Sequence, residues 1–165
     1  MTHRLTFPIS IAAASAALLG SLLFAGPALA ETPFKDLAGR WVGGGSIKLS
    51  DGTSEKISCK ATYFVSNGGN GLSQNIRCAS ASYKFEVKSN LNANGSSISG
   101  SWQELTNNAS GSVSGKASAS SINLSVRGNK VNGSMSVALN GNNQSVTIRP
   151  SDSVVSSISI GMHKG

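Results

Sequence analysis

Histidine is nearly absent from this sequence of 165 residues, which contains only two. One is His3, and the other is His163, two residues from the end of the chain. A histidine metal cluster cannot be assembled from this pair. Serine is abundant, but no serine has a base near it in any strand pairing derived below, so nucleophilic catalysis is not indicated. We therefore expect a protein that is not an enzyme and that uses no cofactor or metal.

Charged residues are also scarce, at 13% of the chain, and acidic residues are the rarer kind. The 14 Lys and Arg residues outnumber the 7 Asp and Glu residues, but they are scattered singly. A nucleic-acid binder would be expected to gather its basic residues into clusters. The sequence thus predicts no nucleic-acid partner, and the mild basic excess is typical of a protein kept soluble by its charge.

Long apolar runs are confined to the start of the chain. His3 and Arg4 precede an alanine- and leucine-rich run over residues 11–25, which is followed by Gly26-Pro27 and the small-residue pattern Ala28-Leu29-Ala30. This charged, apolar and cleavable order predicts a secretory signal peptide over residues 1–30. The run is too short and too weakly flanked for a membrane anchor, and no later stretch could span a bilayer as a helix.

Residues 31–165 are predicted to form one exported domain, either periplasmic or secreted. A segment of this length supports one hydrophobic core but not two. It contains only two cysteines, Cys59 and Cys78. Because exported proteins mature in an oxidising compartment, these two are expected to form one disulfide.

Helical periodicity is missing from this domain, except for one possible turn over residues 33–37. Apolar residues instead fall at every second position in short runs, and most runs end at pairs of turn-forming residues, as in Asn94-Gly95 and Gly141-Asn142. Ser, Asn and Gly dominate after residue 89, but the alternation persists there, which favours folding over disorder. The pattern predicts an all-β, up-and-down antiparallel meander of eight to ten strands. Such a meander normally closes into a barrel, with a two-sheet sandwich as the alternative.

Strand register follows from requiring apolar residues to face one another, since a slip of one residue would put them on opposite faces. The turn at residues 67–70 then sets Cys59 opposite Cys78 across neighbouring strands, so the disulfide and the register agree. The other expected pairs are Ile47 with Ile57, Val87 with Trp102, Trp102 with Val113, Val126 with Val131, and Val137 with Val146.

Five glycines share the predicted inner face with the apolar residues: Gly43, Gly45, Gly100, Gly115 and Gly133. Glycines at such positions either let strands bend and close, or leave space inside the barrel. Bending is the favoured interpretation.

The segment Leu37-Ala38-Gly39-Arg40-Trp41 resembles the Gly-x-Trp opening of lipocalin-like and other calycin barrels. In that family a short helical turn precedes a first strand whose Trp closes one barrel end. The resemblance implies that Trp41 packs under an arginine from late in the barrel, for which Arg127 or Arg149 would serve.

The same segment, with two cysteines a hairpin apart, is also similar to the small periplasmic inhibitors of serralysin-type metalloproteases. In that family the N-terminal segment enters the protease cleft. This resemblance implies a partner-binding arm formed by Glu31, Thr32, Pro33 and Phe34. The Ser/Asn-rich second half departs from the inhibitor family.

Three functions are therefore open, and the first is favoured. It is an exported binding barrel for a small apolar ligand, lined by Trp41, Tyr63, Phe85 and Trp102. Glu104 falls on the same inner face, either as a polar anchor in the pocket or as a rim residue with its carboxylate in water. The second function is inhibition of a hydrolase through the N-terminal arm, and the third is a Ser/Asn-rich structural or surface role.

Overall fold

The computed structural model of the protein describes residues 32–151 and 153–165. The predicted signal peptide, its cleavage point and Glu31 of the predicted arm lie outside the described residues. In the described part of the chain, no helix has the length and apolar character needed to cross a membrane.

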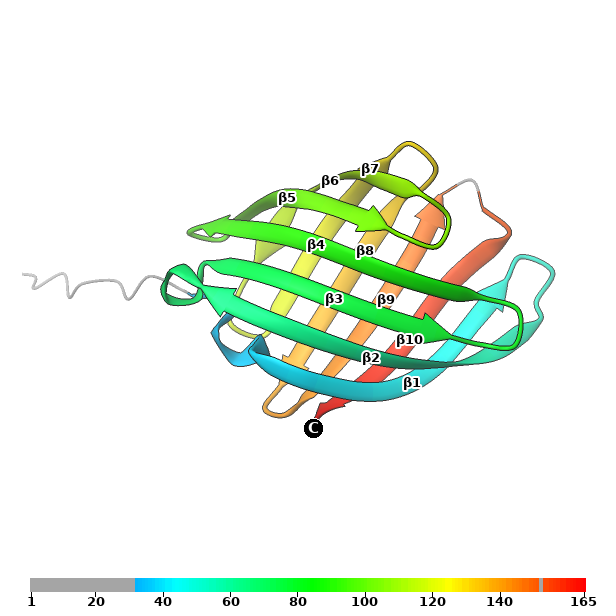
Figure 1. The fold of residues 1–165 in the computed structure, drawn as a ribbon, viewed down its shortest axis with the longest axis horizontal. Coiled ribbons are helices and arrows are strands. Elements are labelled where there is room, and N and C mark those ends of the chain that lie inside the picture. The colour runs from blue at the N-terminus through cyan, green and yellow to red at the C-terminus, as the bar shows by residue number, and fades with distance from the viewer. Residues whose placement is uncertain (1–31, 152) are drawn as a thin grey trace, which may run out of the picture.

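Ten antiparallel strands form a closed barrel in which each strand pairs with its neighbours in sequence and β1 pairs with β10 (Figure 1). The all-β meander and its closure are as predicted. The elements are η1 (Lys35–Leu37), β1 (Gly39–Leu49), β2 (Ser54–Ser66), η2 (Asn67–Gly69), β3 (Gly71–Ala79), β4 (Lys84–Asn94), β5 (Ser97–Glu104), β6 (Ala109–Ala117), β7 (Ser121–Gly128), β8 (Asn132–Asn140), β9 (Asn143–Ser151) and β10 (Val155–Lys164).

The disulfide joins β2 to β3 as predicted, because Cys59 and Cys78 lie directly opposite each other. Both cysteines are buried. The bond is consistent with a protein that matures in an oxidising compartment. The predicted pairing of Val137 with Val146 is also confirmed.

Four other hairpins are displaced from the predicted register by two residues. Ile47 lies opposite Glu55 rather than Ile57, Val87 opposite Glu104 rather than Trp102, Trp102 opposite Gly111 rather than Val113, and Val126 opposite Gly133 rather than Val131. Because side chains alternate with a period of two, a displacement of two leaves every residue on its predicted face.

The inner glycines mark places where neighbouring strands approach closely. A Cβ atom at Gly43 would overlap the carbonyl oxygen of Gly161, and one at Gly115 would overlap that of Asn123. The same holds for the other three predicted positions. These glycines therefore let the strands bend, and they do not leave empty space.

The Ser- and Asn-rich composition belongs to the outer face. There the Ser73 hydroxyl donates to the Asn90 side chain at 2.7 Å, and the Ser136 hydroxyl donates to that of Asn123 at 2.8 Å. Each pair joins residues directly opposite on adjacent strands. Short polar side chains thus link neighbouring strands on the outer face.

Candidate functional site: a cavity open at one end of the barrel

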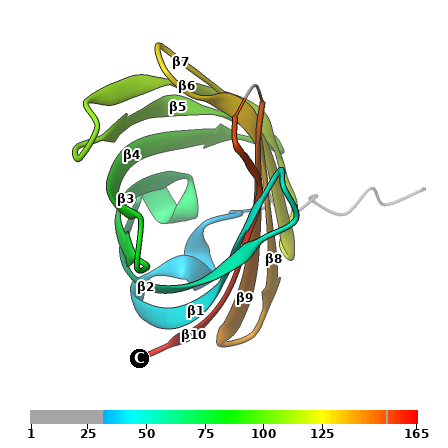
Figure 2. The ribbon, with the colours of Figure 1, turned by 90° about the vertical axis from the view of Figure 1, so that its right-hand side faces the viewer.

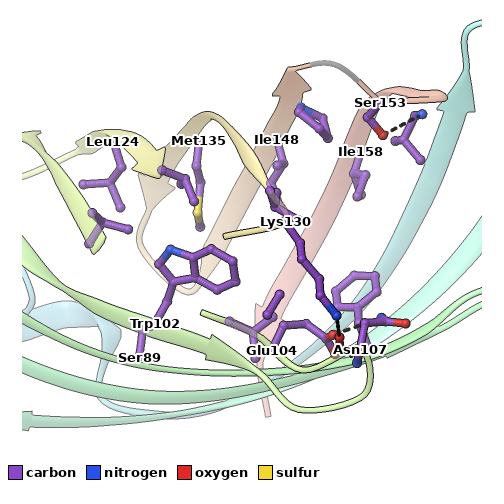
Figure 3. A pocket seen from close by; sticks show the side chains of 18 of the residues that line it. Ser89, Trp102, Glu104, Asn107, Leu124, Lys130, Met135, Ile148, Ser153 and Ile158 are labelled. Atoms are coloured by element: carbon purple, nitrogen blue, oxygen red, sulfur yellow. Dashed lines mark hydrogen bonds between the residues drawn. The ribbon is translucent and has the colours of Figure 1, made fainter. Parts of the chain in front are cut away.

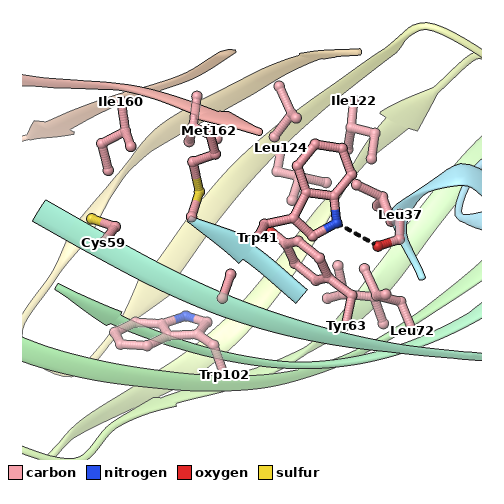
Figure 4. Packing of buried hydrophobic residues seen from close by; sticks show 14 of the residues in the cluster. Leu37, Trp41, Cys59, Tyr63, Leu72, Trp102, Ile122, Leu124, Ile160 and Met162 are labelled. Carbon is pink, nitrogen blue, oxygen red and sulfur yellow. Dashed lines mark hydrogen bonds between the residues drawn. The ribbon is translucent and has the colours of Figure 1, made fainter. Parts of the chain in front are cut away.

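One end of the barrel is filled by the segment that leads into β1. Phe34 and Trp41 are completely buried, and Leu37 is 3% exposed. The Trp41 indole nitrogen donates a hydrogen bond of 2.8 Å to the carbonyl of Leu37, which holds η1 against the first strand (Figure 4). Tyr63 meets the Trp41 ring edge-on, with 6.3 Å between ring centroids. We call this the packed end.

A lysine from the last strand covers Trp41. The Lys164 ammonium group lies 5.5 Å from the centroid of the Trp41 ring and donates to the carbonyl of Asp36 at 3.0 Å. The expectation that Arg127 or Arg149 would occupy this position is wrong, because both alternate with inward-facing residues on their strands and are exposed. A cation over the ring is thus present, but it comes from β10.

The buried polar groups of the packed end bind each other. Gln144 is 3% exposed, and its amide nitrogen donates to the Tyr63 hydroxyl at 3.2 Å. Burial raises the pKa of Tyr63, while the contact with Gln144 acts in the opposite direction. Tyr63 is consequently a neutral, structural residue of the packed end.

The opposite half of the barrel encloses a cavity of about 470 Å³ (Figure 3). Its wall is mainly aliphatic and aromatic, and residues from most of the strands contribute to it. The apolar side chains are Ile47, Tyr83, Phe85, Val87, Leu91, Trp102, Ala109, Val113, Leu124, Val126, Val131, Met135, Ile148, Pro150, Val155 and Ile158. The volume lies within the range of roughly 300–1,000 Å³ that is usual for small-molecule sites.

The cavity opens where the loops at the far ends of the strands meet. Tyr83 comes from the β3–β4 connection, Asn107 from β5–β6, Lys130 from β7–β8 and Ser153 from β9–β10. We call this opening the mouth. Lys130 reaches across part of it, because its ammonium group donates to the carbonyl of Asn107 at 2.7 Å (Figure 3). This contact joins the β5–β6 loop to the β7–β8 loop.

Glu104 organises the loop beside the mouth. One carboxylate oxygen accepts hydrogen bonds from the backbone N–H groups of Glu86 and Thr106, at 3.1 and 2.9 Å. The other accepts from the backbone and side-chain nitrogens of Asn107, at 2.7 and 2.9 Å. Four donors thus occupy a buried carboxylate. This network widens the β5–β6 turn and explains why Trp102 does not pair with Val113.

The pKa of Glu104 is lowered although burial, the largest single influence, raises it. The hydrogen bonds from Asn107, Thr106 and Glu86 favour the charged form and together outweigh burial. Glu104 is therefore ionised at neutral pH. Because its oxygens already accept four bonds, it is a structural anion of the loop and is not available as a base.

This lowered pKa predicts an acid-sensitive contribution to stability. Since the folded-state pKa lies below the ordinary value of 4.5, the stabilisation is present above that pH and is lost as pH falls through the folded-state pKa. Urea unfolding from pH 7 to pH 3 should therefore show a stability difference between wild type and Glu104→Gln that narrows with acidification. Asp51, Glu55 and Glu86 also have lowered pKa values, but they are unchanged in both proteins. If the stability difference between wild type and Glu104→Gln did not change with pH, Glu104 would not be a stabilising anion of the folded state.

The predicted ligand-binding residues are divided between the two ends. Phe85, Trp102 and Glu104 lie in the cavity wall. Trp41 and Tyr63 lie in the packed end and are not part of that wall. Sequence reasoning placed the apolar wall residues Val87, Val113 and Val126 on the inner face but did not separate cavity from core. It missed Lys130 and Asn107, which have no signal beyond being polar loop residues.

The predicted N-terminal arm is partly inside the fold. Pro33 and Phe34 are buried, and the backbone N–H of Phe34 donates to the carbonyl of Gly69 at 3.2 Å. Thr32 packs closely over Gly69. An arm that met a partner through Pro33 and Phe34 would first have to withdraw from the packed end.

The fold and the cavity together define a class, that of closed antiparallel barrels with one packed and one open end. A solved structure with the same fold is the crystal structure of Rv2717c from M. tuberculosis. It is similar with a TM-score of 0.61 and 12% sequence identity, over 79% of this chain and 94% of that chain. At this identity the likeness shows the fold alone. No protein family and no curated protein matches the sequence.

Proposed function

We propose that this protein is an exported, non-enzymatic binding protein that holds one small, mainly apolar molecule in its cavity. The observation that carries the proposal is the unequal filling of the two ends. Protein interiors are usually packed to the density of organic crystals, with few voids larger than a water molecule. Here Phe34, Leu37 and Trp41 fill the packed end, whereas the other end keeps about 470 Å³ between apolar walls.

The polar groups around the cavity support binding rather than catalysis. The Glu104 carboxylate is fully engaged with the loop, and the Lys130 ammonium group donates to the carbonyl of Asn107. Neither is poised as a general base beside the cavity. Burial of a ligand against the aliphatic and aromatic wall would supply the binding energy, at about 25 cal/mol per Å² of apolar surface removed from water.

The alternative functions have less support. A hydrolase inhibitor acting through residues 31–34 would need Phe34, which is completely buried. A stacked structural fibre would need free strand edges, and the closed barrel pairs every strand on both sides. Export is supported by the Cys59–Cys78 disulfide and by the pattern of residues 1–30.

A cavity-blocking substitution tests the proposal. N-phenyl-1-naphthylamine, a neutral dye whose fluorescence rises in apolar sites, is expected to bind the wild-type protein in a one-to-one complex. Met135 lines the cavity from β8, so Met135→Trp should fill part of the space. We expect its affinity to fall by about tenfold or more, equivalent to about 1.4 kcal/mol.

The matched control is Ser134→Trp, which adds the same side chain to the outer face of the same strand. It should bind the dye as the wild type does. Ile148→Trp, on the neighbouring strand β9, provides a second blocking variant in case the first does not fold. If the wild type does not bind, or if both blocked variants bind unchanged, the cavity is not the site.

A further inference from the structure

Ser89 is a buried polar residue whose hydroxyl has no hydrogen-bond partner among residues 32–151 and 153–165. It lies in the middle of β4, on the inner face, and is 5% exposed. Its Oγ atom makes no hydrogen bond, whereas the polar side chains of Gln144 and Glu104 are well partnered. A buried hydroxyl without a partner is unfavourable by about 1–3 kcal/mol. Because the residue itself lines the cavity, a ligand there is the candidate to supply the missing bond.

Ser89 and its neighbours on the adjacent strands form a small polar region in the otherwise apolar cavity wall. Gln74 lies directly opposite on β3, and Trp102 lies directly opposite on β5. All three residues line the cavity, and Figure 3 shows Ser89 beside Trp102. The flanking inner residues of β4 are Val87 and Leu91, which offer no polar atom. A ligand polar group at this depth would therefore find the hydroxyl of Ser89 and the amide of Gln74.

The charges nearby restrict what that group can be. Glu104 follows Trp102 on the same face of β5, one step closer to the mouth, and it is ionised. A second negative charge beside it would be repelled. A positive charge would find both Glu104 oxygens already occupied by N–H donors, so its transfer from water would not be compensated. The polar group of a ligand that fits beside Ser89 and Gln74 is therefore neutral.

We propose that the ligand of this cavity is a neutral, mainly apolar molecule with one hydroxyl or carbonyl group, which binds the Ser89 hydroxyl and the Gln74 amide. This inference rests on the proposed function and adds the chemical class of the ligand. A serine hydroxyl both donates and accepts, so it serves either group. The Oγ atom is shielded in the structure. Binding as proposed therefore includes a rotation about χ1, a movement between staggered rotamers that carries only the hydroxyl, to bring the Oγ atom against the ligand.

A pair of ligands that differ by one hydroxyl tests this inference. Naphthalene and 2-naphthol would be titrated, in competition with N-phenyl-1-naphthylamine, into wild type and Ser89→Ala. The quantity of interest is the ratio of their dissociation constants, because it cancels the shared apolar contact. We expect 2-naphthol to lose about three- to tenfold of its advantage over naphthalene in Ser89→Ala.

The control is Ser101→Ala, a change of the same kind on the outer face of β5, which should leave the ratio unchanged. If both compounds bind but the ratio is the same in wild type and Ser89→Ala, the inference is overturned while the cavity remains the site. Failure of 2-naphthol to bind a protein that takes up the dye overturns it as well. If the dye also fails to bind, the proposed function itself is wrong.

Discussion

Replacing Trp41 with alanine is expected to lower the free energy of unfolding by about 3–5 kcal/mol, the range found for buried tryptophan and phenylalanine truncations. Trp41 is completely buried, packs against Tyr63 and lies under Lys164. Its loss would open a large void at the packed end and remove the hydrogen bond to the carbonyl of Leu37. For a domain of this size the melting temperature should fall by about 10–20 °C.

Phe64 provides the control for this prediction. It is on the neighbouring strand β2, but it faces outward and is 67% exposed. Phe64→Ala should change the free energy of unfolding by no more than about 0.5 kcal/mol. Chemical denaturation of the two variants and the wild type, followed by circular dichroism, measures both effects. A Trp41→Ala protein as stable as Phe64→Ala would show that the packed end is not what holds the barrel closed.

The second large effect is expected from the disulfide. Cys59 and Cys78 are 19 positions apart, and chain-entropy estimates for a closed loop of about that size give about 3 kcal/mol of stabilisation. The double variant Cys59→Ala, Cys78→Ala should therefore unfold at a lower guanidinium concentration by a matching amount. Both cysteines are buried, so the folded protein should also resist reduction.

Reductant separates the contribution of the bond from that of the side chains. In dithiothreitol the unfolding midpoint of the wild type should move toward that of the double variant, while the midpoint of the variant should not move. Equal midpoints for wild type and variant without reductant would show that the β2–β3 pairing is held by its strand contacts alone.

The fold could be predicted from the sequence because the alternation of apolar and polar residues shows which side chains point into the barrel. A register error of two residues does not change which side chains these are. The hairpins at residues 67–70 and 141–142 were paired correctly, while four others were displaced by two residues. At Glu104 the displacement has a visible cause, since its carboxylate binds the backbone of Thr106 and Asn107 and widens the turn. These bonds are local, reaching two and three residues along the chain, but they come from the residue at the end of the strand, which the turn dipeptide Asn107-Asn108 does not include.

The candidate site could be predicted only in part, for a different physical reason. An inward-facing apolar residue either packs in the core or lines the cavity. Which of the two it does depends on how the strands of the whole barrel bend and on what fills the interior. Trp41 and Phe85 have the same local pattern, yet one is in the packed end and the other in the cavity wall. The two residues differ because Phe34 and Leu37, from the segment before β1, fill the end of the barrel where Trp41 lies.

The last residue of the chain, Gly165, lies at the packed end, where its backbone N–H donates to the carbonyl of Arg40 at 2.9 Å (Figure 1). The strands form a ring around the barrel axis (Figure 2). The mouth is at the other end of this barrel, where the β3–β4, β5–β6, β7–β8 and β9–β10 loops contribute to the cavity lining. A peptide tag fused after Gly165 would extend away from the mouth. Protein captured on a sensor surface through such a tag would present the opening to the flowing solution, which orients the molecule for binding measurements without changing any cavity residue.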